Sequence, residues 1–138
     1  MILNQEGQAS MEYLMIMAIA MLILLPLVSI VYSQTARTRK EMGLSALQDS
    51  LEGLSDSANL VQAQGNPAKI TRKLYLPDGT LYSNVTEHHF IVRVETKAGP
   101  TDYSSKTSAS LVGEIPEEAG TYKISLKMEE EGVVNVTF

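Results

Sequence analysis

An uninterrupted apolar segment near the N-terminus constrains this chain more than any other feature. No charged side chain occurs from Tyr13 to Ala36, and all eleven basic residues lie at Arg37 or beyond. About 20 apolar residues cross a bilayer as an α-helix, whereas the apolar core of a cleaved secretory signal has about 7–15. The segment 14–31 fits the first length, and the remaining chain is too small to cover a helix that is apolar on every face. We therefore expect a membrane-spanning helix.

A proline lies inside this apolar segment. Pro26 has no backbone N–H to donate to the preceding helical turn, so we expect a kink or a locally unwound turn there. The alternative is a common transmembrane proline with no special role, and the residues alone favour neither.

The helix is expected to continue past the apolar segment with a different character. Six small or apolar residues recur in steps of three and four, the spacing of a heptad-like seam: Leu44, Leu47, Leu51, Leu54, Ala58 and Val61. Gly65-Asn66-Pro67 ends the pattern, because Gly and Pro together cannot continue a helix. We predict one helix over residues 8–64. Its amphipathic half needs a partner surface, either the C-terminal domain of the same chain or the helices of neighbouring copies.

The apolar pattern changes from helical to strand-like beyond Lys69. Six alternating or short apolar runs are each expected to form a strand: 74–76, the stretch around Leu81, 90–94, 109–112, 122–128 and 134–138. Turn residues separate them, for example at 77–79 and 98–100. The pattern predicts an α+β fold, in which the long helix precedes a small antiparallel β-sandwich of six or seven strands over residues 65–138. Packing against the seam is expected to enlarge its marginal core.

A short polar motif lies directly before the apolar segment. It reads Gly7-Gln8-Ala9-Ser10-Met11-Glu12-Tyr13. A carboxylate within a membrane span costs about 3 kcal/mol, so Glu12 either stays in the headgroup zone or meets a partner. Gln-x-Ser-x-Glu-Tyr before an apolar helix closely resembles the class III signal peptides of archaeal type IV pilin-like proteins. The order of long helix, Gly-Asn-Pro break and β-strands is also similar to that family.

The resemblance implies proteolytic processing. A prepilin peptidase would remove residues 1–7 as a leader peptide by cutting between Gly7 and Gln8, with Ser10 and Tyr13 as recognition positions. Leaders of this family are usually basic, whereas the leader here has no Lys or Arg.

The same resemblance implies a role for the mature chain. Glu12 would become its fifth residue and meet the N-terminal ammonium of an adjacent subunit, a pairing that satisfies two groups which lipid could not. The precursor would lie in the cytoplasmic membrane with its β-domain outside. The mature chain would be a subunit of an extracellular homo-oligomeric filament, built by the pilus assembly machinery and used for adhesion or surface contact. The alternative is a non-polymerising membrane-anchored protein, either an accessory protein of the minor-pilin kind or a surface-binding protein.

Two features indicate opposite orientations in the membrane. Arg37, Arg39 and Lys40 follow the apolar segment, so the positive-inside rule would place the C-terminal domain in the cytoplasm. The processing motif instead requires a cytoplasmic N-terminus. Two Asn-x-Thr sequons, at Asn84 in an expected polar turn and at Asn135 on the last strand, suit the exterior. We expect the exterior orientation, with Asn84 as the better glycosylation site.

The composition argues against other classes of function. A net charge of −5 does not suit nucleic-acid binding, which needs a basic face. The chain has no cysteine, which removes disulfides, thiol catalysis and cysteine-ligated zinc. His88 and His89 are neighbours on an expected strand and would point to opposite faces, so they do not chelate one metal ion. The sequence contains no phosphate-binding glycine loop and no nucleophile elbow, and we expect neither a cofactor nor enzymatic activity.

Overall fold

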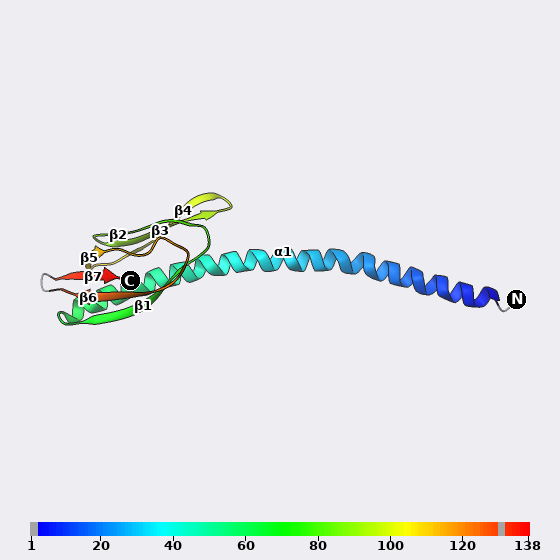
Figure 1. The fold of residues 1–138 in the computed structure, drawn as a ribbon, viewed down its shortest axis with the longest axis horizontal. Helices are drawn as coiled ribbons and strands as arrows, with labels where there is room; N and C mark the ends of the chain where they lie inside the picture. The colour runs from blue at the N-terminus through cyan, green and yellow to red at the C-terminus, as the bar shows by residue number, and fades with distance from the viewer. Residues whose placement is uncertain (1–2, 130–131) are drawn as a thin grey trace. The chain divides into compact units, whose positions relative to one another are not determined.

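The computed structural model describes residues 3–129 and 132–138, so the first two residues of the predicted leader lie outside it. The chain divides after Lys40 into two units. Helix α1 (Leu3–Gln64) supplies residues 3–40 of the first unit and opens the second. It is followed by a small, mostly antiparallel β-domain, which confirms the predicted α+β fold (Figure 1).

The C-terminal end of α1 has a local cause. At Gly65 the backbone turns to a φ of +70°, and the Gly65 N–H donates to the Val61 carbonyl at 3.1 Å, which closes the helix where the sequence predicts. The N-terminal end lies earlier than the predicted Gln8. Residues 3–6 are Leu, Asn, Gln and Glu, none of which breaks a helix, so the helical turn continues into the predicted leader.

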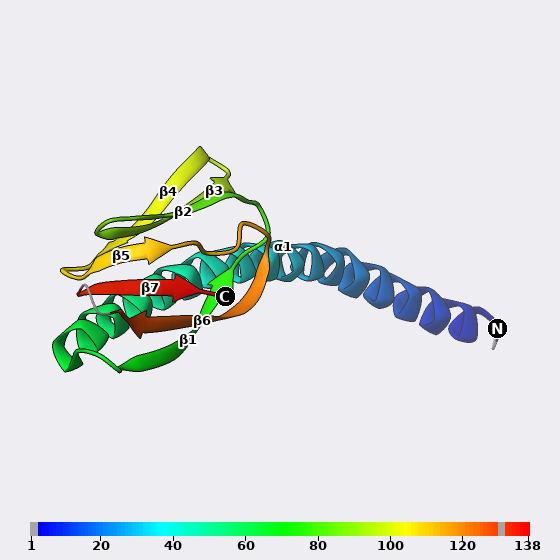
Figure 2. The same cartoon turned by 60° about the vertical axis from the view of Figure 1, so that its left-hand side comes forward.

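Seven strands form two sheets in the second unit (Figure 2). In chain order they are β1 (Lys69–Leu76), β2 (Thr80–Thr86), β3 (His89–Thr96), β4 (Gly99–Lys106), β5 (Ser110–Gly113), β6 (Gly120–Met128) and β7 (Val133–Thr137). One sheet has the order β1-β6-β7-β5 and the other the order β2-β3-β4.

One strand pair departs from the predicted antiparallel arrangement. β5 pairs with β7 in parallel, with Ser110 opposite Val133. β6 has β1 on one side and β7 on the other, and β5 lies at the remaining edge of β7. At that edge the direction of β5 matches that of β7.

β4 was not predicted from the sequence, and two predicted turns lie within strands. β4 reads Gly-Pro-Thr-Asp-Tyr-Ser-Ser-Lys and is mostly exposed, so it has no alternating apolar signal. Gly99 and Pro100, predicted as a turn, are its first residues. Asn84, also predicted in a turn, lies within β2 opposite Ile91. The reversal comes after it, between Thr86 and His89, because the apolar alternation of β3 pairs with the whole of 83–86.

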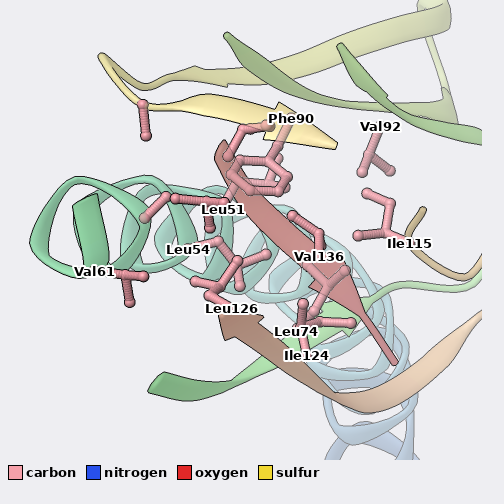
Figure 3. Close-up of a cluster of buried hydrophobic side chains, with 14 of the residues drawn as sticks. Leu51, Leu54, Val61, Leu74, Phe90, Val92, Ile115, Ile124, Leu126 and Val136 are labelled. Atoms are coloured by element: carbon pink, nitrogen blue, oxygen red, sulfur yellow. The ribbon is translucent and has the colours of Figure 1, made fainter. Parts of the chain in front are cut away.

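The core of the second unit is built jointly by α1 and the two sheets. The five central seam residues are fully buried: Leu47, Leu51, Leu54, Ala58 and Val61. Figure 3 shows Leu51 and Leu54 directed toward Phe90 of β3, Leu126 of β6 and Val136 of β7. Of the two partner surfaces left open by the sequence, the seam therefore uses the C-terminal domain of its own chain.

Polar contacts fix α1 to β1 and to the loop between β4 and β5. The Asn59 Oδ1 accepts hydrogen bonds from the Thr107 hydroxyl at 2.7 Å and from the Ser108 N–H at 2.9 Å. The Arg72 Nε donates to the Ser57 hydroxyl at 2.8 Å. These bonds give the seam one register against the domain, because sliding α1 by a residue would leave partly buried polar atoms without partners.

A glycine marks the closest approach between two strands. Gly113 ends β5 at a φ of +130°, and a Cβ there would lie 2.0 Å from the Val136 carbonyl oxygen of β7. We expect Gly113→Ala to destabilise the β-domain by about 1–3 kcal/mol, through backbone strain and the clash together. Chemical denaturation followed by tyrosine fluorescence measures it. Gly99→Ala is the matched control, because Gly99 also has a positive φ (107°) but no atom within 4 Å of its would-be Cβ. Equal losses in both variants would rule out the clash.

Candidate membrane and assembly segment

The segment 7–40 of α1 contains the apolar run 14–31, which lies on the surface of the helix. Every side chain of the segment is exposed, including Leu22 at 73% and Tyr32 at 81%. Soluble monomers rarely expose contiguous apolar patches above a few hundred Å². This segment therefore needs cover from lipid or from other helices.

Helix α1 meets the requirements for a membrane anchor by length and composition. It contains an apolar stretch with few charges that is long enough to span a bilayer, and none of that stretch is buried within the described residues. A signal sequence near an N-terminus meets the same requirements. The segment is thus a candidate membrane anchor.

The motif residues all lie within α1 and are exposed. Gln8 and Glu12 are four residues apart, so they share one face of the helix, while Ser10 and Tyr13 are three apart and share another. Glu12 forms no ion pair with any residue in the described ranges. The helix thus separates the predicted pairing residue from the two predicted recognition residues, and Gly7-Gln8, the predicted scissile bond, is helical.

Helix α1 continues through Pro26 without a break. The locally unwound turn considered from the sequence is therefore absent from the described helix, although the Leu22 carbonyl has no N–H partner one turn later. Further along, hydroxyl groups bond back to the preceding turn: Ser33 to the Ile30 carbonyl and Thr35 to the Val31 carbonyl, both at 2.9 Å. The sequence analysis missed this role, which lets polar residues remain in an apolar environment.

The two sequons have different surroundings. Asn84 is exposed on β2, and its side chain forms no hydrogen bond with the described residues. Asn135 is half-buried on β7, between β5 and β6, and its Nδ2 donates to the Glu129 Oε1 at 2.7 Å. Asn84 is therefore the more accessible of the two amides.

The histidines are not arranged as a metal site. His88 lies in the turn before β3 rather than on a strand, and its Nδ1 is 3.0 Å from the Ala109 carbonyl oxygen. His89 is the first residue of β3. Across residues 3–129 and 132–138, no group of three or more potential ligands is placed to hold a metal ion.

One charged pair on the β-domain has strongly directional geometry. The Arg93 guanidinium donates to both Asp102 carboxylate oxygens, at 2.6 and 2.8 Å, across β3 and β4. These hydrogen bonds lower the pKa of the Asp102 carboxyl and raise the pKa of Arg93. Both side chains are about half exposed, so the pair contributes little to the stability of the domain. Its contribution is to the pairing of β4 with β3, where Arg93 lies opposite Asp102.

Comparisons with protein-family models, with curated proteins and with solved structures find no match for this chain.

Proposed function

We propose that this chain is the precursor of a structural subunit of an archaeal type IV-like surface pilus. Peptidase cleavage after Gly7 yields a mature chain that assembles through the N-terminal part of α1. The β-domain remains outside the cell and contacts surfaces. The observation that carries the proposal is the fully exposed apolar segment that begins immediately after the Gln-x-Ser-x-Glu-Tyr motif.

The division of labour along α1 supports this proposal. The seam from Leu47 to Val61 is buried by its own β-domain, so it is not available to neighbouring copies. Contacts between copies then involve the segment 7–40 and the outer face of the later turns. In a packed bundle of such helices, the Glu12 carboxylate and the ammonium of a processed neighbour satisfy each other.

A membrane-anchored accessory protein that does not polymerise is the second proposal. It uses the same export motif and the same apolar helix, and lipid alone covers the segment 7–40. The self-contained core of the β-domain favours it, because this domain needs no neighbour to bury its seam.

The N-terminal peptide and the intact mass decide between these proposals. We expect the chain from sheared surface material to begin at Gln8, which is the result required for a processed and exported filament subunit. A chain that keeps Met1 and occurs only in membranes contradicts the filament and supports the resident anchored protein.

A variant at the cleavage site links that result to the motif. We expect Gly7→Val to leave the chain membrane-bound and unprocessed, because a bulky side chain replaces the small residue before the scissile bond. Met11→Leu changes a position that the motif leaves open, and its mature chain should begin at Gln8, as that of the parent does. Normal trimming of Gly7→Val would refute the assigned cleavage site.

Glycosylation provides a test of the external location. We expect a glycan on Asn84 and none on Asn135, since the Asn135 side chain is half-buried on β7 and its amide donates to Glu129. Asn84→Gln should remove the added mass from the mature chain, and Asn135→Gln should leave that mass unchanged. A glycan found on Asn135 instead would contradict the accessibility argument.

A further inference from the structure

The outer face of α1 in the second unit carries a row of carboxylates. Asp49, Glu52 and Asp56 follow in steps of three and four, so they lie along one face of the helix, and all three are exposed. This acidic row points away from the seam, whose residues are buried. The β-domain therefore does not use this face of α1.

The acidic row is poorly compensated within the described chain. The Gln48 amide donates to Glu52 at 2.9 Å, and none of the ion pairs among the described residues involves the row. Like charges three and four residues apart on a helix repel each other. No Lys or Arg occurs from residue 41 to residue 68, so no cation on the same stretch of helix relieves that repulsion.

Three cations occur together at the end of the first unit. Arg37, Arg39 and Lys40 form a basic segment with exposed side chains, and they too take part in no ion pair among the described residues. They are the only basic residues before Lys69. The basic segment and the acidic row match in number and are opposite in sign.

We propose that the acidic row docks against the basic segment of a second copy of this chain. The inference rests on the proposed filament, and it requires that parallel helices of neighbouring copies are staggered, because the acidic row follows the basic segment along α1. One contact of this kind neutralises both surfaces at once, whereas an anionic lipid surface would cover the basic segment and leave the acidic row bare. It also sets the stagger between copies, which uniform apolar packing leaves undefined.

Zero-length cross-linking tests the contact on the native chain. A carbodiimide joins an amine directly to a carboxylate that touches it, and Lys40 is the only lysine of the basic segment. About 13 Å of helix rise separates Lys40 from Asp49, so a direct link between them can form only between copies. We expect a peptide linking Lys40 to Asp49, Glu52 or Asp56, in species at least two chains in size. The link should weaken in high salt and vanish in Lys40→Arg, which lacks the amine.

The outcomes separate this inference from the proposed function. The link found in sheared filaments supports both, and the link found in membranes of cells without filaments supports the contact while overturning the filament. Filaments in which Lys40 is linked to no residue of the acidic row overturn the contact and keep the filament. That result is also the one expected if lipid headgroups cover the basic segment. If neither filaments nor the link is found, both the filament and the contact are overturned.

Charge reversal provides the second measurement. Changing Asp49, Glu52 and Asp56 to lysine should lower the yield of sheared filaments about tenfold. Changing Arg37, Arg39 and Lys40 to glutamate in the same chain should restore it. The matched control changes three exposed acids of the β-domain to lysine, with the same change in net charge and no expected loss: Glu95, Glu114 and Glu117. An equal loss in the control, or no restoration by the double reversal, overturns the contact.

Discussion

Replacing Glu12 by alanine is expected to leave the chain in the membrane and to abolish filaments. The proposed partner of the carboxylate is the N-terminal ammonium of a neighbouring copy, inside a bundle of apolar helices. Removing one member of a buried charge pair costs about 3–5 kcal/mol, because the other charge stays buried and unpaired. Each 1.4 kcal/mol is about tenfold in an equilibrium constant, so we expect at least about a hundredfold fewer filaments. Electron microscopy and the sheared fraction measure that loss.

Two further variants assign the effect to the charge. Glu12→Gln keeps the shape of the side chain and should fail to assemble as Glu12→Ala does. Glu117→Ala removes an exposed carboxylate from the β-domain and should assemble normally. Abundant filaments from Glu12→Ala would remove the pairing role from the proposal, even if processing at Gly7 stands.

Truncating Leu54 is expected to remove a large part of the stability of the β-domain. Leu54 is fully buried at the centre of the seam, among side chains from both sheets. Leu→Ala substitutions in such cores cost about 2–5 kcal/mol, from lost burial and from the cavity that remains. Small domains have a total stability of about 5–15 kcal/mol, so this loss is a large fraction of it. Denaturation of the full chain in detergent, followed by hydrogen exchange of the β-strand amides, measures the change.

The same helix offers a matched control. Leu60 is 48% exposed, on the face away from the core. Leu60→Ala removes the same atoms and should change the free energy of unfolding by no more than about 0.5 kcal/mol. Similar losses at both positions would mean that the seam is not the main support of the β-domain. An intact domain in Leu54→Ala would point to cover from neighbouring copies instead.

The sequence by itself determined the helix and most of the strands. The apolar residues from Leu44 to Val61 fall at helical spacing, and Gly65-Asn66-Pro67 can only end a helix, so the end of α1 was predictable from local chemistry. Alternation likewise located β3, β6 and β7, because one face of each is buried and the other is not. The motif from Gly7 to Tyr13 is also a property of the sequence, and its roles in processing and assembly remain predictions.

Only the tertiary structure decided how these elements meet. The spacing of three and four residues shows that α1 has an apolar seam, but it does not show what covers that seam. In the structure the two sheets of the same chain cover it, through contacts between residues far apart in the sequence. β4 carries no apolar period because it lies at a sheet edge, and the parallel pairing of β5 with β7 joins strands that are far apart in the chain. Both are consequences of strand order, which is set by long-range packing rather than by the residues of any one strand.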